Sequence, residues 1–148
     1  MAEPFSIRKM EEADRNDWID LYCALFPEGS RVGMSREIDQ ILASEKRDGF
    51  CAENAKGILG FVEYGIRDFA NGCISKPVPF LEGIFVRPEA RGKGVGKALL
   101  EFLEDLARSQ GFREMGSDVL AENAHSLKFH ALQGFEETER VVYFRKEI

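Results

Sequence analysis

The chain has 148 residues, 44% of them hydrophobic, and a net charge of −6, a composition typical of one soluble domain with a sizeable core. No apolar run approaches the roughly 20 residues of a membrane span, and Met1 to Pro4 lack the pattern of a signal peptide. Three scattered cysteines indicate neither a disulfide framework nor a zinc site, and the acidic balance argues against nucleic acid and suits a cationic small molecule. We expect a single cytoplasmic domain over residues 1–148.

The first part of the chain predicts a short strand followed by two helices. Residues 5–9 alternate like a strand. A helix is expected from after Asp14 to Pro27, because apolar residues recur at helical spacing, namely Trp18, Leu21, Tyr22 and Leu25. Residues 28–33 have the composition of a loop. Ser35 is then the expected N-cap of a second helix, whose apolar face would carry Ile38, Ile41 and Leu42.

The middle of the chain predicts three strands. Residues 49–55 and 58–67 form the two arms of a hairpin that turns at residues 54–57. Asn71-Gly72 marks another tight turn. Residues 80–86 form a third strand, which Arg87-Pro88 closes.

The second half predicts two more helices and two more strands. A helix over 95–110 has an apolar stripe and stops at Gly111, a strand covers 113–119, a short helix runs from 123 to 132 and ends before Gly134, and a last strand covers 137–146. The expected order is therefore β-α-α-β-β-β-α-β-α-β, an α+β fold with a mixed sheet. The stripe of the first helix consists of Val95, Leu99, Phe102 and Leu106.

A glycine-rich run links the strand over 80–86 to the helix over 95–110. It reads Arg91-Gly92-Lys93-Gly94-Val95-Gly96, and basic side chains surround it in an otherwise acidic chain. Glycines at the start of a helix leave backbone N–H groups accessible, which is where a phosphate binds well. A Walker loop is excluded, because Ala98 follows Lys97 and Arg91 occupies the place of the first glycine. A dinucleotide fingerprint is also excluded, because its third glycine would come one residue later.

The spacing that remains is Arg/Gln-x-x-Gly-x-Gly/Ala, and Arg91, Gly94 and Gly96 satisfy it. It resembles the acetyl-CoA pyrophosphate loop of the Gcn5-related N-acetyltransferase (GNAT) superfamily. A second segment is similar to the superfamily's Asn-x-x-Ala/Ser-x-x-Leu-Tyr-x-x-x-Gly-Phe motif through Asn123, Ser126, Phe129, His130, Gly134 and Phe135.

The superfamily resemblance implies a central, mostly antiparallel sheet that is splayed in the middle and flanked by helices. It also implies that acetyl-CoA is the cosubstrate. Backbone groups of Ile84, Phe85 and Val86 would pair with the pantetheine and the thioester oxygen. Asn123 would touch the pantetheine or phosphate region. The pyrophosphate would be held by the run Arg91, Gly92, Lys93, Gly94, Val95, Gly96 and Lys97.

Longer segments resemble one branch of the superfamily, the aminoglycoside 6'-N-acetyltransferases of resistant bacteria. They are Asn71-Gly72-Cys73, the stretch from Pro77 to Val86, Met115-Gly116-Ser117-Asp118 and the stretch from Gly134 to Val142. The resemblance covers most of the chain from Ile66 onward. It implies direct acetyl transfer to a 6'-amino group and a homodimeric assembly.

Three acidic residues are the expected acceptor side of this site. Glu82 lies on a strand face with Phe80, Ile84 and Val86, where an unpaired carboxylate is costly, so it is expected either to receive the amine's proton or to pair with a nearby Arg. Asp118 lines the aminoglycoside pocket in the related enzymes and would otherwise cap a helix. Glu139, on the predicted last strand, either faces the antibiotic or is a solvated surface charge.

Two aromatic residues and a histidine complete the prediction. Phe26 and Phe69 occupy positions where the related enzymes carry aromatic residues against the sugar, although core packing explains them nearly as well. His130 replaces the Tyr that commonly protonates the leaving thiolate, and imidazole can donate a proton near neutral pH. The alternative is a partly buried helix histidine. His125 is five residues away, which does not put the two imidazoles on one helix face, so no metal is expected.

Two other functions are compatible with these residues. One is an N-acetyltransferase for a polyamine or another natural amine. The other is a non-catalytic acetyl-CoA-binding module, against which the three acids at the acceptor end argue, because a binding module needs none of them.

Overall fold

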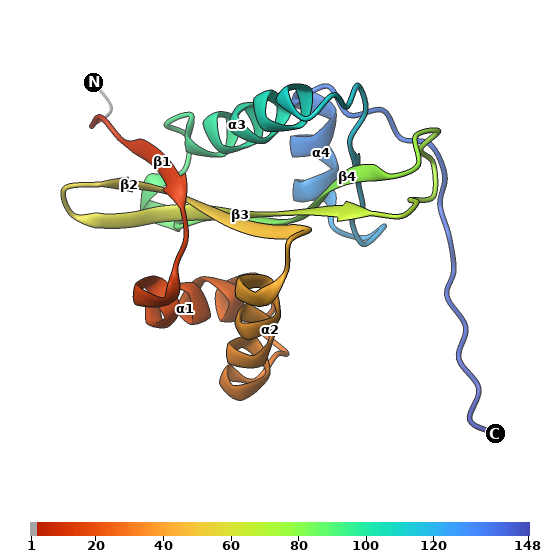
Figure 1. The fold of residues 1–148 in the computed structure, drawn as a ribbon, viewed down its shortest axis with the longest axis horizontal. Helices are drawn as coiled ribbons and strands as arrows, with labels where there is room; N and C mark the ends of the chain where they lie inside the picture. Colours follow the sequence, from red (N-terminus) through yellow and green to blue (C-terminus); the bar gives the residue numbers. More distant parts are fainter. Residues whose placement is uncertain (1–2) are drawn as a thin grey trace.

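The computed structural model of the chain describes residues 3–148, and within that range one five-stranded sheet carries helices on both faces (Figure 1). The strands lie in chain order across the sheet. Each pair of neighbours is antiparallel except the last, which is parallel. The predicted mixed, mostly antiparallel sheet is confirmed. Its strands are β1 (Ser6–Lys9), β2 (Arg47–Asn54), β3 (Gly57–Arg67), β4 (Val78–Val86) and β5 (Gly116–Ser117).

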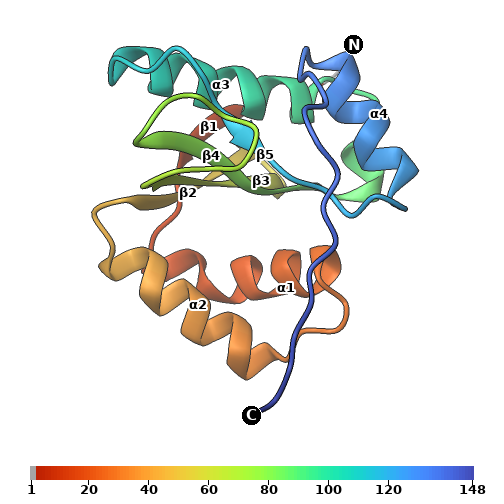
Figure 2. The same ribbon diagram turned by 90° about the vertical axis from the view of Figure 1, so that its right-hand side faces the viewer.

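Two helices lie on each side of the sheet (Figures 1 and 2). One side has α1 (Arg15–Leu25) and α2 (Arg31–Ala43), and the other has α3 (Val95–Ser109) and α4 (Ala124–Leu132). Short 3-10 turns precede α1, at Glu12–Asp14, and follow β4, at Pro88–Ala90. None of the helices within residues 3–148 has both the length and the apolarity needed to cross a membrane.

The predicted helix faces form two cores, one on each side of the sheet. Trp18, Leu21 and Tyr22 of α1 are buried beside Ile38 and Ile41 of α2, and the apolar stripe of α3 packs on the opposite face. Gly49 of β2 is required here, because an added Cβ would lie 2.5 Å from the Trp18 ring. Leu42 was expected in this core but is exposed, because it lies one position beyond the buried face of α2.

The start of α2 was predicted five residues too late. The helix begins at Arg31, and its N-cap is Ser30, whose hydroxyl accepts a hydrogen bond from the Gly33 N–H. Ser35 lies inside the helix and accepts a hydrogen bond from Arg15 instead. Both serines have the chemistry of a cap, and local sequence does not distinguish them. The second half of the loop expected over 28–33 is therefore helix.

The end of the chain differs most from the prediction. The strand over 113–119 is reduced to β5, and the last strand, over 137–146, is not formed. Within the described chain, residues 136–148 pair with no strand and run as an extended segment past the β5 edge toward the α1 and α2 side (Figure 2). Val142, Tyr143 and Phe144 are therefore exposed, by 74%, 82% and 93%. An alternating sequence favours an extended backbone but does not supply the neighbouring strand with which it must pair.

A charged cluster lies between the sheet and the helices α1 and α2, with Glu63 buried and Glu37 at its exposed edge. The Tyr22 hydroxyl donates a hydrogen bond to the carboxylate of Glu63, and Arg47 donates to both Glu63 and Glu37. Burial raises the pKa of Glu63, and the hydrogen bonds from Tyr22 and Arg47 act against this increase. The only cation that contacts Glu63 in the described structure is Arg47.

Candidate active site

The parallel strands β4 and β5 part after two pairs of residues. Phe80 lies opposite Gly116 and Leu81 opposite Ser117, where β5 ends, while β4 continues to Val86. On its other edge, β4 remains paired with β3 as far as Val86. Within the described residues, the β5-facing edge of β4 beyond Leu81 has no strand partner. This stretch contains Ile84, Phe85 and Val86, so the backbone edge expected to bind pantetheine is open, although the Val86 carbonyl accepts a hydrogen bond from Arg91.

Glu82 is the extra residue of a β-bulge in β4. Glu63 of β3 pairs with Gly83 and Tyr64 pairs with Leu81, so Glu82 has no opposite residue. The bulge reverses the alternation of side chains along the strand. Ile84 and Val86 pack in the α3 core together with Tyr64 of β3. The Glu82 carboxylate instead lies 3.1 Å from the place of a Cβ on Gly65, which follows Tyr64 and faces the opposite side of the sheet. The expectation that Glu82 shares a face with Ile84 and Val86 is therefore wrong, because strict alternation does not allow for a bulge.

Arg67, at the end of β3, pairs with the carboxylate of Glu82. Its Nε and Nη2 atoms lie 2.8 and 2.6 Å from the two carboxylate oxygens, a bidentate ion pair. The guanidinium also lies 3.5 Å from the centre of the Phe80 ring. Two roles were expected for Glu82, proton acceptor or partner of a nearby Arg, and the structure shows the pairing with an Arg. An acceptor amine would meet a carboxylate held in one orientation by an existing cation.

Asp118 stands at the end of β5, close enough to influence this ion pair through its charge. It directly follows Ser117, the last residue of β5, and its side chain is exposed. The hydrogen bonds to Glu82 are the main cause of the raised pKa of Arg67, and the negative charge of Asp118 adds to it. Glu82 and Arg67 therefore form an ion pair near the point where the strands part, and the charge of Asp118 acts on the guanidinium from further away.

The glycine-rich run forms an open cradle at the N-terminus of α3. Gly92 and Gly94 have φ of +73° and +83°, values that favour glycine, and a Cβ at either would meet no atom within 4 Å. The first N–H groups of α3, from Val95 to Lys97, have no partner within the helix, which begins with the bond from Ala98 N–H to the Gly94 carbonyl. The open space above the glycines and the free N–H groups of the helix suit a pyrophosphate.

We predict that Gly94→Ala weakens coenzyme binding by about 10-fold, because a left-handed backbone costs an L-residue roughly 1–2 kcal/mol and the loop would relax away from its binding shape. Gly111→Ala is the matched control. Gly111 has φ +89° at the other end of α3, and its Cβ would also enter open space. Both variants should lose stability, so the measurement that separates them is the dissociation constant of CoA by calorimetric titration, which should rise only in Gly94→Ala. Equal dissociation constants for the two variants would contradict the cradle.

The two aromatic residues expected at the sugar come from different elements. Phe26 caps the C-terminus of α1 and stacks on Tyr22 with 6.1 Å between ring centres. Phe69 lies in the loop after β3, two residues beyond Arg67. Their exposures of 45% and 63% show that neither is a core side chain. Both rings are thus accessible to a ligand.

Two other predicted residues have structural partners, whereas a third, Glu139, is exposed. Asn123 is the N-cap of α4, and its side-chain oxygen accepts a hydrogen bond from the Ser126 N–H. His130 has both ring nitrogens in hydrogen-bond contact, with Ser117 on one side and Ser126 on the other. Glu139 is exposed on the extended C-terminal segment, so the strand position expected for it does not exist.

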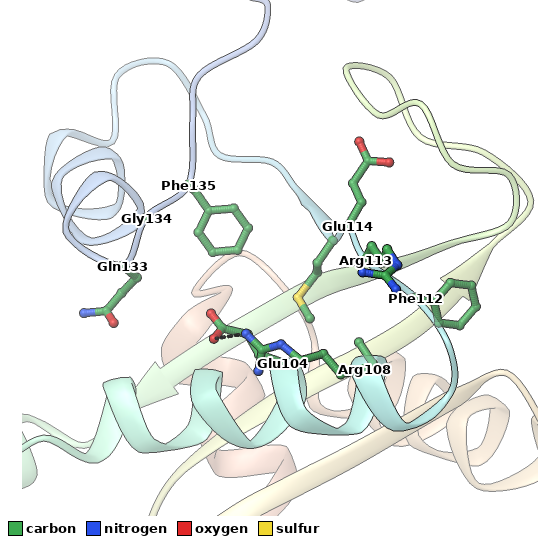
Figure 3. Close-up of a pocket in the computed structure, with 10 residues that line it drawn as sticks. Glu104, Arg108, Phe112, Arg113, Glu114, Gln133, Gly134 and Phe135 are labelled. Atoms are coloured by element: carbon green, nitrogen blue, oxygen red, sulfur yellow. Dashed lines mark ion pairs between the residues drawn. The ribbon is translucent and has the colours of Figure 1, made fainter.

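A hollow of about 210 Å³ lies away from these residues, between the C-terminal half of α3, the segment leading to β5 and the end of α4 (Figure 3). None of the predicted site residues lines it, and a Glu104–Arg108 ion pair lies on its α3 wall. The lining of the hollow consists of Glu104, Ala107, Arg108, Phe112, Arg113, Glu114, Met115, Gln133, Gly134 and Phe135.

Within residues 3–148, no three His, Cys, Asp or Glu side chains gather in a way that could hold a metal ion.

A parted pair of parallel strands beside a glycine cradle agrees with the comparison with known families. A model described as the acetyltransferase (GNAT) family matches residues 15–135, which is most of the chain. The chain belongs to the GNAT acetyltransferase family. This GNAT protein is 42% identical over 147 residues to an aminoglycoside N(6')-acetyltransferase type 1 of Stenotrophomonas maltophilia, covering 98% of this chain and 95% of that protein. A protein of the same description from Serratia marcescens is 41% identical over 133 residues, covering 88% and 91%.

Solved structures of GNAT enzymes have the same fold as this chain. AAC(6')-Iy in complex with the bisubstrate analogue CoA-S-monomethyl-acetylneamine superposes with a TM-score of 0.91 at 37% identity, over 99% of this chain and 100% of that one. The aminoglycoside antibiotic 6'-N-acetyltransferase AAC(6')-Ih from Acinetobacter baumannii gives 0.90 at 35% identity, over 98% and 99%. The cosubstrate of this GNAT enzyme is acetyl-CoA, whose thioester supplies an activated acetyl group.

Two residues of the GNAT site were missed in the sequence. Arg67 stands at the end of a predicted strand, and the only sign of its role was that a carboxylate at Glu82 needed a partner. Ser117 lies inside the recognised stretch Met115-Gly116-Ser117-Asp118, but only Asp118 of that stretch was considered as a site residue. Arg67 meets Glu82 across the paired strands β3 and β4, and Ser117 of β5 meets His130 of α4, and the sequence displays neither contact.

Proposed function

We propose that this acetyltransferase transfers the acetyl group of acetyl-CoA to the 6'-amino group of an aminoglycoside antibiotic and thereby confers resistance. The observation that carries the proposal is the position of Glu82 and Asp118 where β4 and β5 part, next to the open edge of β4. An acceptor amine held by these carboxylates would lie beside a thioester bound along that edge. The high identity to aminoglycoside N(6')-acetyltransferases over nearly the whole chain supports the same acceptor.

In this proposal the two carboxylates have different environments and different tasks. Glu82 is held in one orientation by Arg67, so it receives the amine's proton, directly or through water, and leaves a neutral nucleophile. Asp118 is exposed and adds attraction for a polycationic sugar. Phe26 and Phe69 offer apolar surface to the sugar rings, and the cradle from Arg91 to Lys97 holds the pyrophosphate.

The decisive assay measures release of CoA thiol from acetyl-CoA with a matched pair of acceptors. Neomycin carries a 6'-amine and paromomycin a 6'-hydroxyl on otherwise closely similar structures. We expect release with neomycin, kanamycin and tobramycin, and much slower release with paromomycin. Higher kcat/KM for spermidine than for every aminoglycoside would instead indicate a natural-amine acetyltransferase. CoA binding with no turnover of any amine would indicate a binding module.

We also propose that the enzyme is a homodimer that acts in the cytoplasm, where acetyl-CoA is made and used. The exposed residues Val141, Val142, Tyr143 and Phe144 support an assembly through the C-terminal segment, since such a row of apolar side chains rarely stays uncovered in water. We predict that the full chain elutes as a dimer in light-scattering chromatography, and that Val142→Ser/Phe144→Ser shifts it to a monomer. A monomeric wild-type chain at micromolar concentration would contradict this assembly.

A further inference from the structure

The side chains of Ser117 and His130 form a hydrogen-bonded pair at the point where β4 and β5 part. Ser117 Oγ lies 2.8 Å from His130 Nε2 and 3.4 Å from the carbonyl oxygen of Leu81. Leu81 is the last β4 residue paired with β5, and the bulged Glu82 follows it. The Ser117 hydroxyl therefore lies next to both the open edge of β4 and the acidic acceptor side.

The other ring nitrogen of His130 establishes where the proton lies on the imidazole. Nδ1 is 2.8 Å from the main-chain oxygen of Ser126, which can only accept, so Nδ1 carries a hydrogen and donates it. In the neutral ring, Nε2 then accepts the Ser117 hydroxyl hydrogen. In the protonated ring, Nε2 donates to Ser117 Oγ, and the hydroxyl hydrogen must point to another acceptor.

Aromatic packing holds this pair in place. The Phe129 and Phe135 ring centres lie 6.0 and 4.9 Å from that of His130. Phe129 in turn contacts the start of α3, where a Cβ on Gly96 would lie 3.3 Å from its ring. With both nitrogens engaged, the imidazole has none left for a sulfur atom, whereas the half-buried Ser117 hydroxyl changes its direction of donation with the charge on the ring.

We propose that Ser117 is the catalytic group that protonates the departing thiolate, and that His130 is a positioning residue that supplies this proton through it. The inference rests on the acetyl transfer proposed above. As the amine nitrogen bonds to the acetyl carbon, the carbon–sulfur bond breaks and its electron pair stays on sulfur. Ser117 gives its hydroxyl proton to that sulfur and takes the Nε2 proton of His130, which leaves an intact serine and a neutral imidazole.

The protons balance over one turnover. The substrate ammonium loses two protons toward Glu82 and water, the first before attack and the second as the amide forms. Solvent returns one proton to Nε2 of the partly exposed His130. The net products are the amide, free CoA thiol and one released proton.

The test compares Ser117→Ala, Ser117→Thr, His130→Gln and the Ser117→Ala/His130→Gln pair on whichever amine the wild-type enzyme acetylates. We expect Ser117→Ala and His130→Gln each to lower kcat roughly 10- to 100-fold, with the dissociation constant of CoA unchanged by calorimetry. Ser117→Thr keeps a hydroxyl and should keep most activity. The double variant should be no slower than the slower single variant, because both act on one proton path.

The solvent deuterium isotope effect on kcat reports on proton transfer, so it distinguishes a catalytic role of this pair from a purely structural one. We expect it in the wild-type enzyme and in Ser117→Thr, and a much smaller effect in Ser117→Ala and His130→Gln. If His130 only fastens α4 to β5, the variants lower Tm and CoA affinity and leave kcat and the isotope effect as they were, which would overturn the inference. Turnover of a different amine overturns only the aminoglycoside proposal, whereas no turnover with any amine overturns both.

Discussion

Glu82→Gln is expected to lower kcat/KM for a 6'-amino aminoglycoside by roughly 100-fold or more, the range in which a positioned general base contributes. The loss has two physical parts. The amide takes no proton from the ammonium, which lowers kcat. It also leaves the guanidinium of Arg67 without its bidentate partner, and this uncompensated cation repels a polycationic acceptor, which raises KM.

A second substitution separates these two parts. Arg67→Met in the Glu82→Gln background removes the unpaired cation, so KM should recover while kcat stays low. Steady-state kinetics of both variants at matched ionic strength measures how the loss divides between kcat and KM. Added salt should reduce only the increase in KM, because it screens the repulsion between Arg67 and the cationic acceptor.

The matched control is Glu53→Gln. Glu53 is also a strand carboxylate in a bidentate pair, at 2.7 and 3.1 Å from Arg8, but it lies outside the site. It should change kcat/KM by less than about twofold, as expected of a surface ion pair remote from the chemistry. If Glu82→Gln behaves like Glu53→Gln, Glu82 is only a structural partner of Arg67 and the proposed base is wrong.

Arg47→Met is expected to cost about 3–5 kcal/mol of the free energy of unfolding at neutral pH, because it leaves a buried carboxylate without its cation. Glu63 is 4% exposed, and the Tyr22 hydroxyl would be the hydrogen-bond donor left to it. Glu37, the other partner of Arg47, is much more exposed and can be solvated. The loss therefore comes from Glu63.

The pH dependence of this loss has a definite sign. The pKa of Glu63 is raised in the folded protein, so the native state binds this proton more tightly than the unfolded chain. The stability contributed by such a group is complete below its ordinary pKa and is lost as the pH rises through the folded value. Removing Arg47 raises the folded pKa further, since the cation favoured the charged form. The variant should therefore lose more stability at pH 8 than at pH 5, measured by urea unfolding at both.

Arg47→Met/Glu63→Gln is the control, because it removes the buried charge together with its partner. It should recover most of the lost stability and abolish the difference between pH 5 and pH 8. Coupling of this size is expected only of residues in contact. A loss of less than about 1 kcal/mol in Arg47→Met at both pH values would contradict the cluster as described.

The elements that were predicted well depend on residues close together in the chain. The hairpin of β2 and β3, the apolar faces of α1 and α3 and the turn into α3 all follow from spacing over a few residues. The glycine cradle is of the same kind, because a left-handed backbone and an uncovered helix N-terminus are local properties. The failures at the start of α2 and at the last strand have different causes. The first is a choice between two serines that could both cap the helix. The second is a segment that forms a strand only if another strand lies beside it, which its own residues do not specify.

The sequence by itself determined the donor side of this enzyme: the strand, glycine run and helix that suit acetyl-CoA lie within residues 80–110, and their spacing excludes other phosphate loops. Only the tertiary structure decided the acceptor side. The bulge at Glu82 depends on the register of β3 with β4, and the contacts of Glu82 with Arg67 and of Ser117 with His130 join residues 15 and 13 positions apart. Such contacts depend on strand register and on how α4 packs against α3. These are energies of the whole fold, and no short stretch of residues contains them.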